Sequence, residues 1–183
     1  EYSPLIYDAQ NKNESHNMLE KVFYVGQAKD RFDGLLACYK RLKSIGIPCD
    51  FYITNVPEEK MKYSDEIVYN KMISYSNCVD HIIGSSCLID IIQGDSTGLT
   101  IKTCEAVCYD KKLITTNKHV KDYPFYDERY IRIIENPYDI DVEFFKNNKC
   151  VHYSEEGKQI FSADAFLRKL ELLIGKGENT CQM

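Results

Sequence analysis

Patterns that mark metal sites and disulfide frameworks are missing from this sequence, although it contains eight cysteines. It has no Cys-x-x-Cys pair, no histidine–cysteine cluster at zinc-ligand spacing and no secretory segment. Cys38, Cys104 and Cys108 fall on predicted helix faces and Cys87 in an apolar run, where a free thiol behaves as a small apolar side chain. We therefore expect reduced thiols, no metal site and a cytoplasmic location.

Long apolar runs and blocks of basic residues are absent too. The longest apolar run is far shorter than a membrane span, so any membrane contact would be peripheral. The net charge is −5, the pI is near 5.4, and the lysines and arginines are scattered along the chain. This pattern argues against a general nucleic-acid-binding surface but leaves room for a local anion site.

Length and hydrophobic content favour a single domain. A chain of 183 residues with 44% hydrophobic residues can form one well-packed core, whereas two domains would each be small. Residues 1–20 are polar and irregular, so we expect a lead-in there and one domain over residues 21–183. The sequence starts with glutamate rather than methionine, which suggests a piece of a longer protein.

From residue 21 onward, short β-branched or aromatic runs alternate with helical patterns. This alternation predicts an α/β fold with a doubly wound, mostly parallel, six-stranded Rossmann-like sheet. Strands are expected at residues 22–25, 51–53, 72–75, 87–92, 113–116 and 131–134. Helices are expected at residues 30–45, 79–83 and 139–145 and from residue 99. Ser162 is expected to cap a last helix, whose inner face would carry Phe166, Leu167, Leu170, Leu173 and Ile174.

The segment from Gly98 to Asn117 is the strongest candidate for a ligand site, because a glycine opens a helix there and a short strand follows. Free backbone N–H groups and the positive end of the helix dipole at residues 99–101 would suit a phosphate. Glu105, at the border of the apolar helix face, could accept hydrogen bonds from sugar hydroxyls. The alternative is that Glu105 only pairs with Lys102, one turn back.

The loop after the first predicted strand, residues 25–31, offers a second anion contact. Gly26 stands where the backbone must turn, and Lys29 and Arg31 could hold a diphosphate as a charge-assisted pair. The loop has neither the Gly-x-Gly-x-x-Gly fingerprint nor the Walker lysine pattern, so NAD and P-loop nucleotides are not supported. The alternative is that both cations are ordinary solvated side chains beside a helix start.

Three further polar residues lie in or after the fourth predicted strand. Asp90 falls within an apolar run, so it must find hydrogen-bond donors, and a structural role is expected for it. Gln93 and Asp95 follow in the loop and are candidates for sugar contacts.

Together these residues resemble the C-terminal, donor-binding half of a GT-B glycosyltransferase. More narrowly, they are similar to family-4-like bacterial proteins of capsule, O-antigen or lipopolysaccharide synthesis. The shared signature is Gly-Leu-Thr-x-Arg-Thr-x-Glu-Ala and then Lys-Lys-Leu-Ile-Thr-Thr-Asn, which align with residues 98–106 and 111–117. The Val25-Gly26 loop with its two cations, Ile73-Ser74-Tyr75 and Phe144-Phe145 also fall where that group has comparable residues, so the resemblance spans residues 21–146.

The resemblance implies a nucleotide-diphosphate sugar as donor substrate, with no cofactor and no metal. Glu105 would hold the ribose, the helix start and the Lys29/Arg31 loop would hold the diphosphate, and residues 93–97 would face the sugar. The implied donor-binding residues are Gly26, Gln27, Lys29, Arg31, Tyr75, Gln93, Asp95, Thr97, Gly98, Leu99, Thr100, Lys102 and Glu105.

Two positions depart from the family pattern. Thr97 stands where the broader family often has a second glutamate. Lys102 replaces the usual arginine, which keeps the charge but loses the bidentate fork. The motif therefore indicates the nucleotide more clearly than the sugar.

The resemblance also implies a partner, because GT-B enzymes place the acceptor site on an N-terminal lobe that this chain lacks. We expect these residues to bind donor but to transfer sugar poorly or not at all, with a lipid-linked acceptor at the inner face of the membrane as a further partner. The alternative is a non-catalytic Rossmann-like module that serves in protein assembly. A flavodoxin-like or response-regulator-like domain is disfavoured, because no acidic cluster follows the first strand to hold magnesium.

Overall fold

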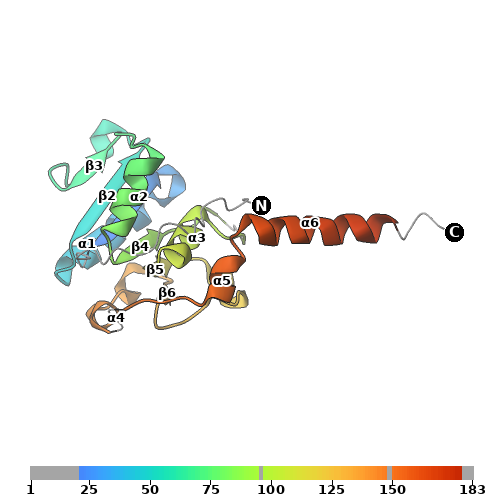
Figure 1. Cartoon of the computed structure of the whole chain (residues 1–183). Coiled ribbons are helices and arrows are strands. Elements are labelled where there is room, and N and C mark those ends of the chain that lie inside the picture. Colours follow the sequence, from blue (N-terminus) through green and yellow to red (C-terminus); the bar gives the residue numbers. More distant parts are fainter. Residues whose placement is uncertain (1–20, 95–96, 148–149, 179–183) are drawn as a thin grey trace.

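A six-stranded parallel sheet forms the centre of the protein (Figure 1). The structure, a computed structural model, describes residues 21–94, 97–147 and 150–178, so the expected lead-in lies outside the described residues. The strand order is β3-β2-β1-β4-β5-β6 and every neighbouring pair is parallel, which confirms the predicted doubly wound α/β fold. The strands are β1 (Val22–Gln27), β2 (Cys49–Thr54), β3 (Ile67–Tyr69), β4 (Cys87–Asp90), β5 (Lys112–Thr115) and β6 (Ile131–Ile133).

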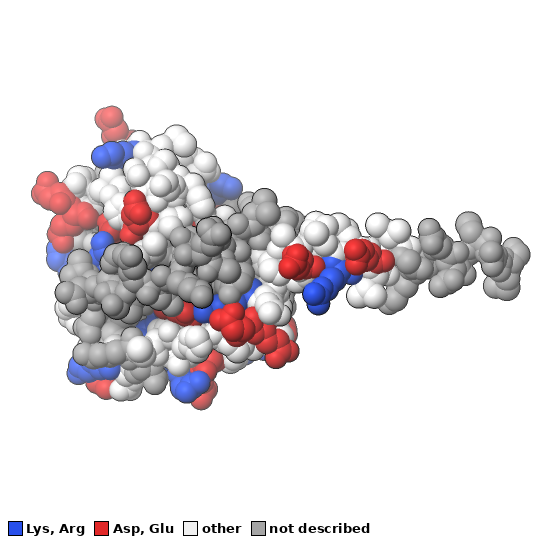
Figure 2. Space-filling view, viewed as in Figure 1, with Lys and Arg blue, Asp and Glu red and all other residues white. Residues whose placement is uncertain are grey.

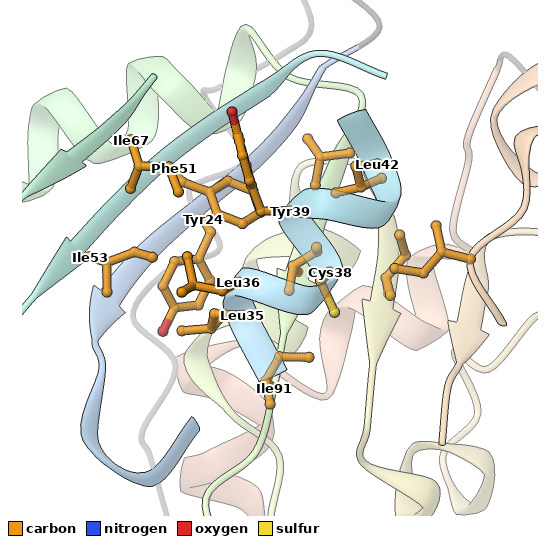
Figure 3. Close-up of a cluster of buried hydrophobic side chains, with 14 of the residues drawn as sticks. Tyr24, Leu35, Leu36, Cys38, Tyr39, Leu42, Phe51, Ile53, Ile67 and Ile91 are labelled. Carbon is orange, nitrogen blue, oxygen red and sulfur yellow. The ribbon is translucent and has the colours of Figure 1, made fainter. Parts of the chain in front are cut away.

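Helices cover both faces of the sheet, because successive side chains of a strand point to opposite faces. In β1, Tyr24 joins a core with α1 and α4, whereas Phe23 joins a second core with α2, α3 and the residues that flank α5. Figure 3 shows the first of these cores, where Leu35 and Leu36 of α1 lie close to Tyr24. The α-helices are α1 (Phe32–Ser44), α2 (Tyr75–Ile83), α3 (Ile101–Cys108), α4 (Val142–Lys146), α5 (Glu155–Gln159) and α6 (Ala163–Glu178).

In the described ranges, the charged side chains are mixed on the surface and the cysteines form no disulfide. Acidic and basic side chains are interspersed on the face seen in Figure 2 and do not form one basic area. The seven described cysteines are free thiols, and burial raises the pKa of Cys104 to about 12. None of the helices described here has both the length and the hydropathy needed to cross a bilayer.

The predicted third strand is misplaced by a few residues. The strand β3 ends at Tyr69, and its first residue, Ile67, pairs with Phe51 and is 1% exposed. Residues 72–75 instead leave the sheet, where Met72 is 89% exposed, and Tyr75 is the first residue of α2. Ser74 caps that helix by accepting a hydrogen bond from the Asn77 N–H, a local signal that outweighs the apolar residues around it.

The last helix forms as predicted but does not pack on the sheet. The Ser162 hydroxyl accepts a hydrogen bond from the Ala165 N–H at 3.2 Å, as expected of a cap. Leu167, Leu170 and Ile174 are 54%, 38% and 65% exposed, because α6 projects away from the body (Figure 1). The predicted inner face is therefore wrong for Leu167, Leu170 and Ile174. Phe166 is half-buried, and the Leu173 side chain lies outside the described residues.

We predict that a chain ending at Ser162 has nearly the stability of the full chain. Side chains without core contacts contribute little, so the free energy of unfolding should change by no more than about 0.5 kcal/mol. A chain ending at Ile160 is the control, because it also loses the buried Phe161 and should be destabilised by about 3 kcal/mol. Urea denaturation followed by circular dichroism measures both, and a large loss at Ser162 would mean that α6 does pack on the body.

Candidate functional site

The sequence-predicted residues meet where the strand order reverses, between β1 and β4. Connections from β1 build the sheet in one direction and those from β4 in the other, which leaves a crevice beyond the carboxyl ends of these strands. Arg31 spans this crevice, because its guanidinium donates to the Gln27 carbonyl and to the Ile91 carbonyl, each at 3.0 Å. It therefore ties the loop after β1 to the loop after β4.

Lys29 and Gln93 join the same two loops at the exposed rim. The Lys29 ammonium donates to the Gln93 Oε1 at 3.2 Å. Lys29 has a φ of 45°, a left-handed conformation that is uncommon outside glycine. Lys29, predicted to contact the diphosphate, and Gln93, predicted to contact the sugar, thus lie side by side.

Lys102 reaches the crevice from the first turn of α3. Its ammonium lies 5.1 Å from the centroid of the Tyr24 ring, and a Cβ added to Gly26 would lie 3.6 Å from it. The same Cβ would lie 2.9 Å from the Tyr24 hydroxyl, so only glycine fits at this point of β1 without displacing a neighbour.

The Lys102 ammonium is half-buried yet has no direct acceptor. Within the described residues it forms no hydrogen bond and no ion pair. Burial lowers its pKa, and the nearby carboxyls of Asp90 and Glu105 oppose that shift. The simple Lys102–Glu105 surface pair that the sequence left open is therefore not formed.

Glu105 is more buried than its sequence position suggested. It was expected at the border of the apolar face of α3, but its side chain is only 4% exposed. Burial raises its pKa to about 7, although Lys102 and a hydrogen bond with Tyr75 act to lower it. Tyr75 reaches this carboxyl from the start of α2 and is 51% exposed, so part of its surface faces solvent.

Asp90, the last residue of β4, has the structural role that its burial predicted. Its Oδ2 accepts hydrogen bonds from Thr100, Thr103 and Thr115 at 2.7, 3.2 and 3.5 Å. Burial raises the pKa of Asp90, and the Thr100 hydroxyl and Lys102 oppose that rise. Thr100 also caps α3 by accepting from the Thr103 N–H, so the acid connects the end of β4 to the start of the helix.

The start of α3 has the features of an anion-binding helix end. The first N–H groups of a helix have no acceptor in the preceding turn, and the helix dipole makes this end positive. Leu99 and Ile101 are half-exposed, and Thr97 and Gly98 are exposed. The Gly98 carbonyl accepts a hydrogen bond from the Asn117 side chain at 3.0 Å, which links this loop to the end of β5.

The structure thus gathers most of the predicted residues around one crevice. Gly26, Arg31, Tyr75, Lys102 and Glu105 surround it, while Lys29 and Gln93 form its rim. Gln27 contributes its carbonyl to Arg31 rather than its side chain, and Asp95 lies outside the described residues. Sequence reasoning gave no role to four contributors: Tyr24, which looks like an ordinary strand residue, and Thr103, Thr115 and Asn117, which lie within the signature segment but whose partners only the fold shows.

No protein-family model matches this chain, and no curated protein matches it. The assignment of function therefore depends on the geometry of the site together with the motif resemblance. In the described ranges, no group of three or more histidine, cysteine, aspartate or glutamate side chains could hold a metal ion.

We predict that Glu105→Gln removes a pH dependence of stability. Because the folded pKa lies near 7 and the ordinary value is 4.5, the folded state binds the extra proton between these values. The stability that wild type gains from the raised pKa of Glu105 is therefore fully present below about pH 4.5 and is lost as the pH rises through about 7. Between about pH 4.5 and 7, the free energy of unfolding of the variant should rise by about 2 to 3 kcal/mol relative to that of wild type. Above about pH 7 the difference between the two should stay constant.

Urea denaturation at several pH values from about 4 to about 8 measures this difference. The same change at Glu143, an exposed residue of α4, provides the control and should follow the wild-type curve. A Glu105→Gln curve parallel to wild type throughout would contradict the raised pKa.

Proposed function

We propose that this chain is the nucleotide-sugar-binding half of a glycosyltransferase of cell-surface polysaccharide synthesis. The observation that supports it most is the Lys102 ammonium, half-buried at the strand-order reversal with no hydrogen bond or ion pair among the described residues. A partly desolvated cation with open donor positions favours an anion, and a phosphate would lie between it and the start of α3.

The diphosphate would lie between Lys102 and the N–H groups of residues 99–101. Arg31 would act differently from the sequence expectation, because its guanidinium donates to the carbonyls of Gln27 and Ile91. Its role would be to hold the two loops in register and to add positive charge. Lys29 would exchange Gln93 for a phosphate oxygen at the rim, since their hydrogen bond is exposed.

The ribose would lie at Glu105. Its carboxyl has a pKa of about 7, so a good share of it is ionised near neutral pH, and a carboxylate can accept from two vicinal hydroxyls. Tyr75 borders the same carboxyl and is half-exposed, which leaves its ring available to one side of a bound nucleoside. The sugar would then extend toward Gln93 and Thr97.

In this proposal the chain binds donor but does not complete transfer. The crevice supplies cations and hydrogen-bond partners for a nucleotide, while the acceptor and the catalytic base would come from a second lobe. Steady transfer of sugar from a nucleotide donor to any acceptor by these 183 residues alone would contradict this assignment.

Calorimetric titration with UDP, GDP and their sugars, and with uridine and guanosine, tests the site. Lys102→Met should weaken binding of the nucleoside diphosphate about tenfold or more and leave the nucleoside unaffected, because only the phosphates contact the lysine. Glu105→Ala should weaken both ligands to a similar degree, because both contain ribose.

Lys146→Met and Glu143→Ala are matched controls, since these residues form an exposed ion pair on α4 at 3.2 Å. Both controls should bind like wild type. Absence of binding to every nucleotide tested, or equal binding by wild type and both site variants, would overturn the proposed function.

A second candidate, the non-catalytic assembly module, is favoured by one observation. Leu167, Leu172 and Ile174 on the projecting helix α6 are more than half exposed, which is unusual for large apolar side chains grouped on one helix. Sedimentation velocity of wild type and Leu167→Glu separates the two candidates. Self-association that the variant loses, in a chain that binds no nucleotide, would support the assembly module.

A further inference from the structure

Three consecutive polar side chains at the end of β5 hold the segment that leads from β4 into α3. The Thr115 hydroxyl donates to the Asp90 carboxylate at 3.5 Å, and the Thr116 hydroxyl accepts from the Ile92 N–H at 3.0 Å. The Asn117 side-chain amide donates to the Gly98 carbonyl at 3.0 Å. We call Thr115, Thr116 and Asn117 the β5 clamp. Its three members hold three successive points of the segment from Asp90 to Gly98.

The side chain of Asn117 is fixed in one orientation. The residue is fully buried, its Oδ1 accepts from the His119 N–H at 3.0 Å, and its own N–H donates to the Thr115 hydroxyl at 3.0 Å. With the oxygen occupied in this way, the amide nitrogen must face the Gly98 carbonyl. The local fold therefore holds the Asn117 side chain in the one rotamer that contacts Gly98.

Gly98 has little else to hold it. It lacks a side chain, it is exposed, and a Cβ built on it would meet no atom within 4 Å. It stands two residues before Thr100, the cap of α3, so a shift of Gly98 would move the N–H groups of residues 99–101. The direction of these donors depends on the hydrogen bond from Asn117 at Gly98, together with the hydrogen bond of Thr100 to Asp90 at the other end.

We propose that Asn117 is a positioning residue for the anion site, which aims the N–H groups of residues 99–101, leading into α3, through the Gly98 carbonyl without touching the ligand. This inference rests on the proposed function, because it assumes that a diphosphate is what those N–H groups bind. A purely structural residue would affect stability, whereas a positioning residue affects the phosphate part of the ligand selectively.

Asn117→Ser is the test variant. Serine is also a good cap, so it can still accept from the His119 N–H, but it is too short to reach Gly98. Asn117 caps the short 3-10 helix Lys118–Asp122, and Asn136 caps a similar one, Pro137–Asp139, by accepting from the Tyr138 N–H. Asn136→Ser is therefore the matched control. Binding of UDP and uridine, or of GDP and guanosine if wild type prefers them, is measured by calorimetry.

The expected result is a selective loss. In Asn117→Ser the affinity ratio of diphosphate to nucleoside should fall about tenfold, while nucleoside affinity and the Asn136→Ser ratio stay at wild-type values. Hydrogen exchange of the amides of residues 99–101 should also be faster in Asn117→Ser than in wild type or the control.

The outcomes separate the positioning role from the proposed function. An unchanged ratio in a wild type that binds nucleotide overturns the positioning role alone. Unchanged hydrogen exchange overturns the clamp whatever the nucleotides do. A wild type that binds no nucleotide overturns the proposed function and the positioning role together, even if exchange at residues 99–101 is faster in the variant.

If Asn117→Ser does not fold, Thr116→Val is the second variant. It removes the acceptor for the Ile92 N–H but keeps the shape of the side chain, and the same selective loss is expected, though smaller. Thr116→Ser keeps the hydroxyl and should restore the wild-type ratio. Equal ratios in Thr116→Val and Thr116→Ser would overturn the inference.

Discussion

The rest of the site depends on the hydrogen bonds to the buried Asp90 carboxylate. A carboxyl group that is 2% exposed is costly unless donors surround it, and here three threonine hydroxyls reach the same oxygen. These threonines come from the start of α3 and the end of β5, so one acid at the end of β4 joins three elements. Loss of its partners would leave an unsatisfied buried group, which strongly disfavours any rearrangement of the crevice.

The electrostatics of the crevice follow from the same burial. Desolvation raises the pKa of both Asp90 and Glu105, and the pKa of about 7 for Glu105 means that its negative charge is only partly present near neutral pH. The Arg31 guanidinium lies at the same crevice, and the two carboxyls oppose the lowering of the Lys102 pKa. Two basic side chains, Arg31 and Lys102, thus lie at one crevice of a chain with net charge −5, so an anion site of the proposed kind would need no basic surface.

Short-range patterns in the sequence predicted most of the fold, because apolar runs and caps are local. They were insufficient at β3, where a three-residue strand has one buried residue, Ile67, and a second, longer run of mostly apolar residues lies just beyond it. Helical periodicity predicted α6 but could not say whether its face is covered. At the site, Gly26 and Glu105 were recognisable from local motifs, and Asn117 ended the same signature without a role, whereas Tyr24 belongs to the site only through folding, since strand pairing brings distant residues to one edge.

The exposure of the crevice itself bears on what the proposed donor lobe can do. Glu105 and Asp90 are buried, so the nucleotide end would be shielded, but Gln93, Thr97 and Gly98 at the sugar end are exposed. A reacting sugar must be kept from water if transfer is to compete with hydrolysis. The described residues of this rim are exposed loop residues, so they do not exclude water there. In the proposed function, a second surface would therefore close over the sugar end and would also bring the acceptor.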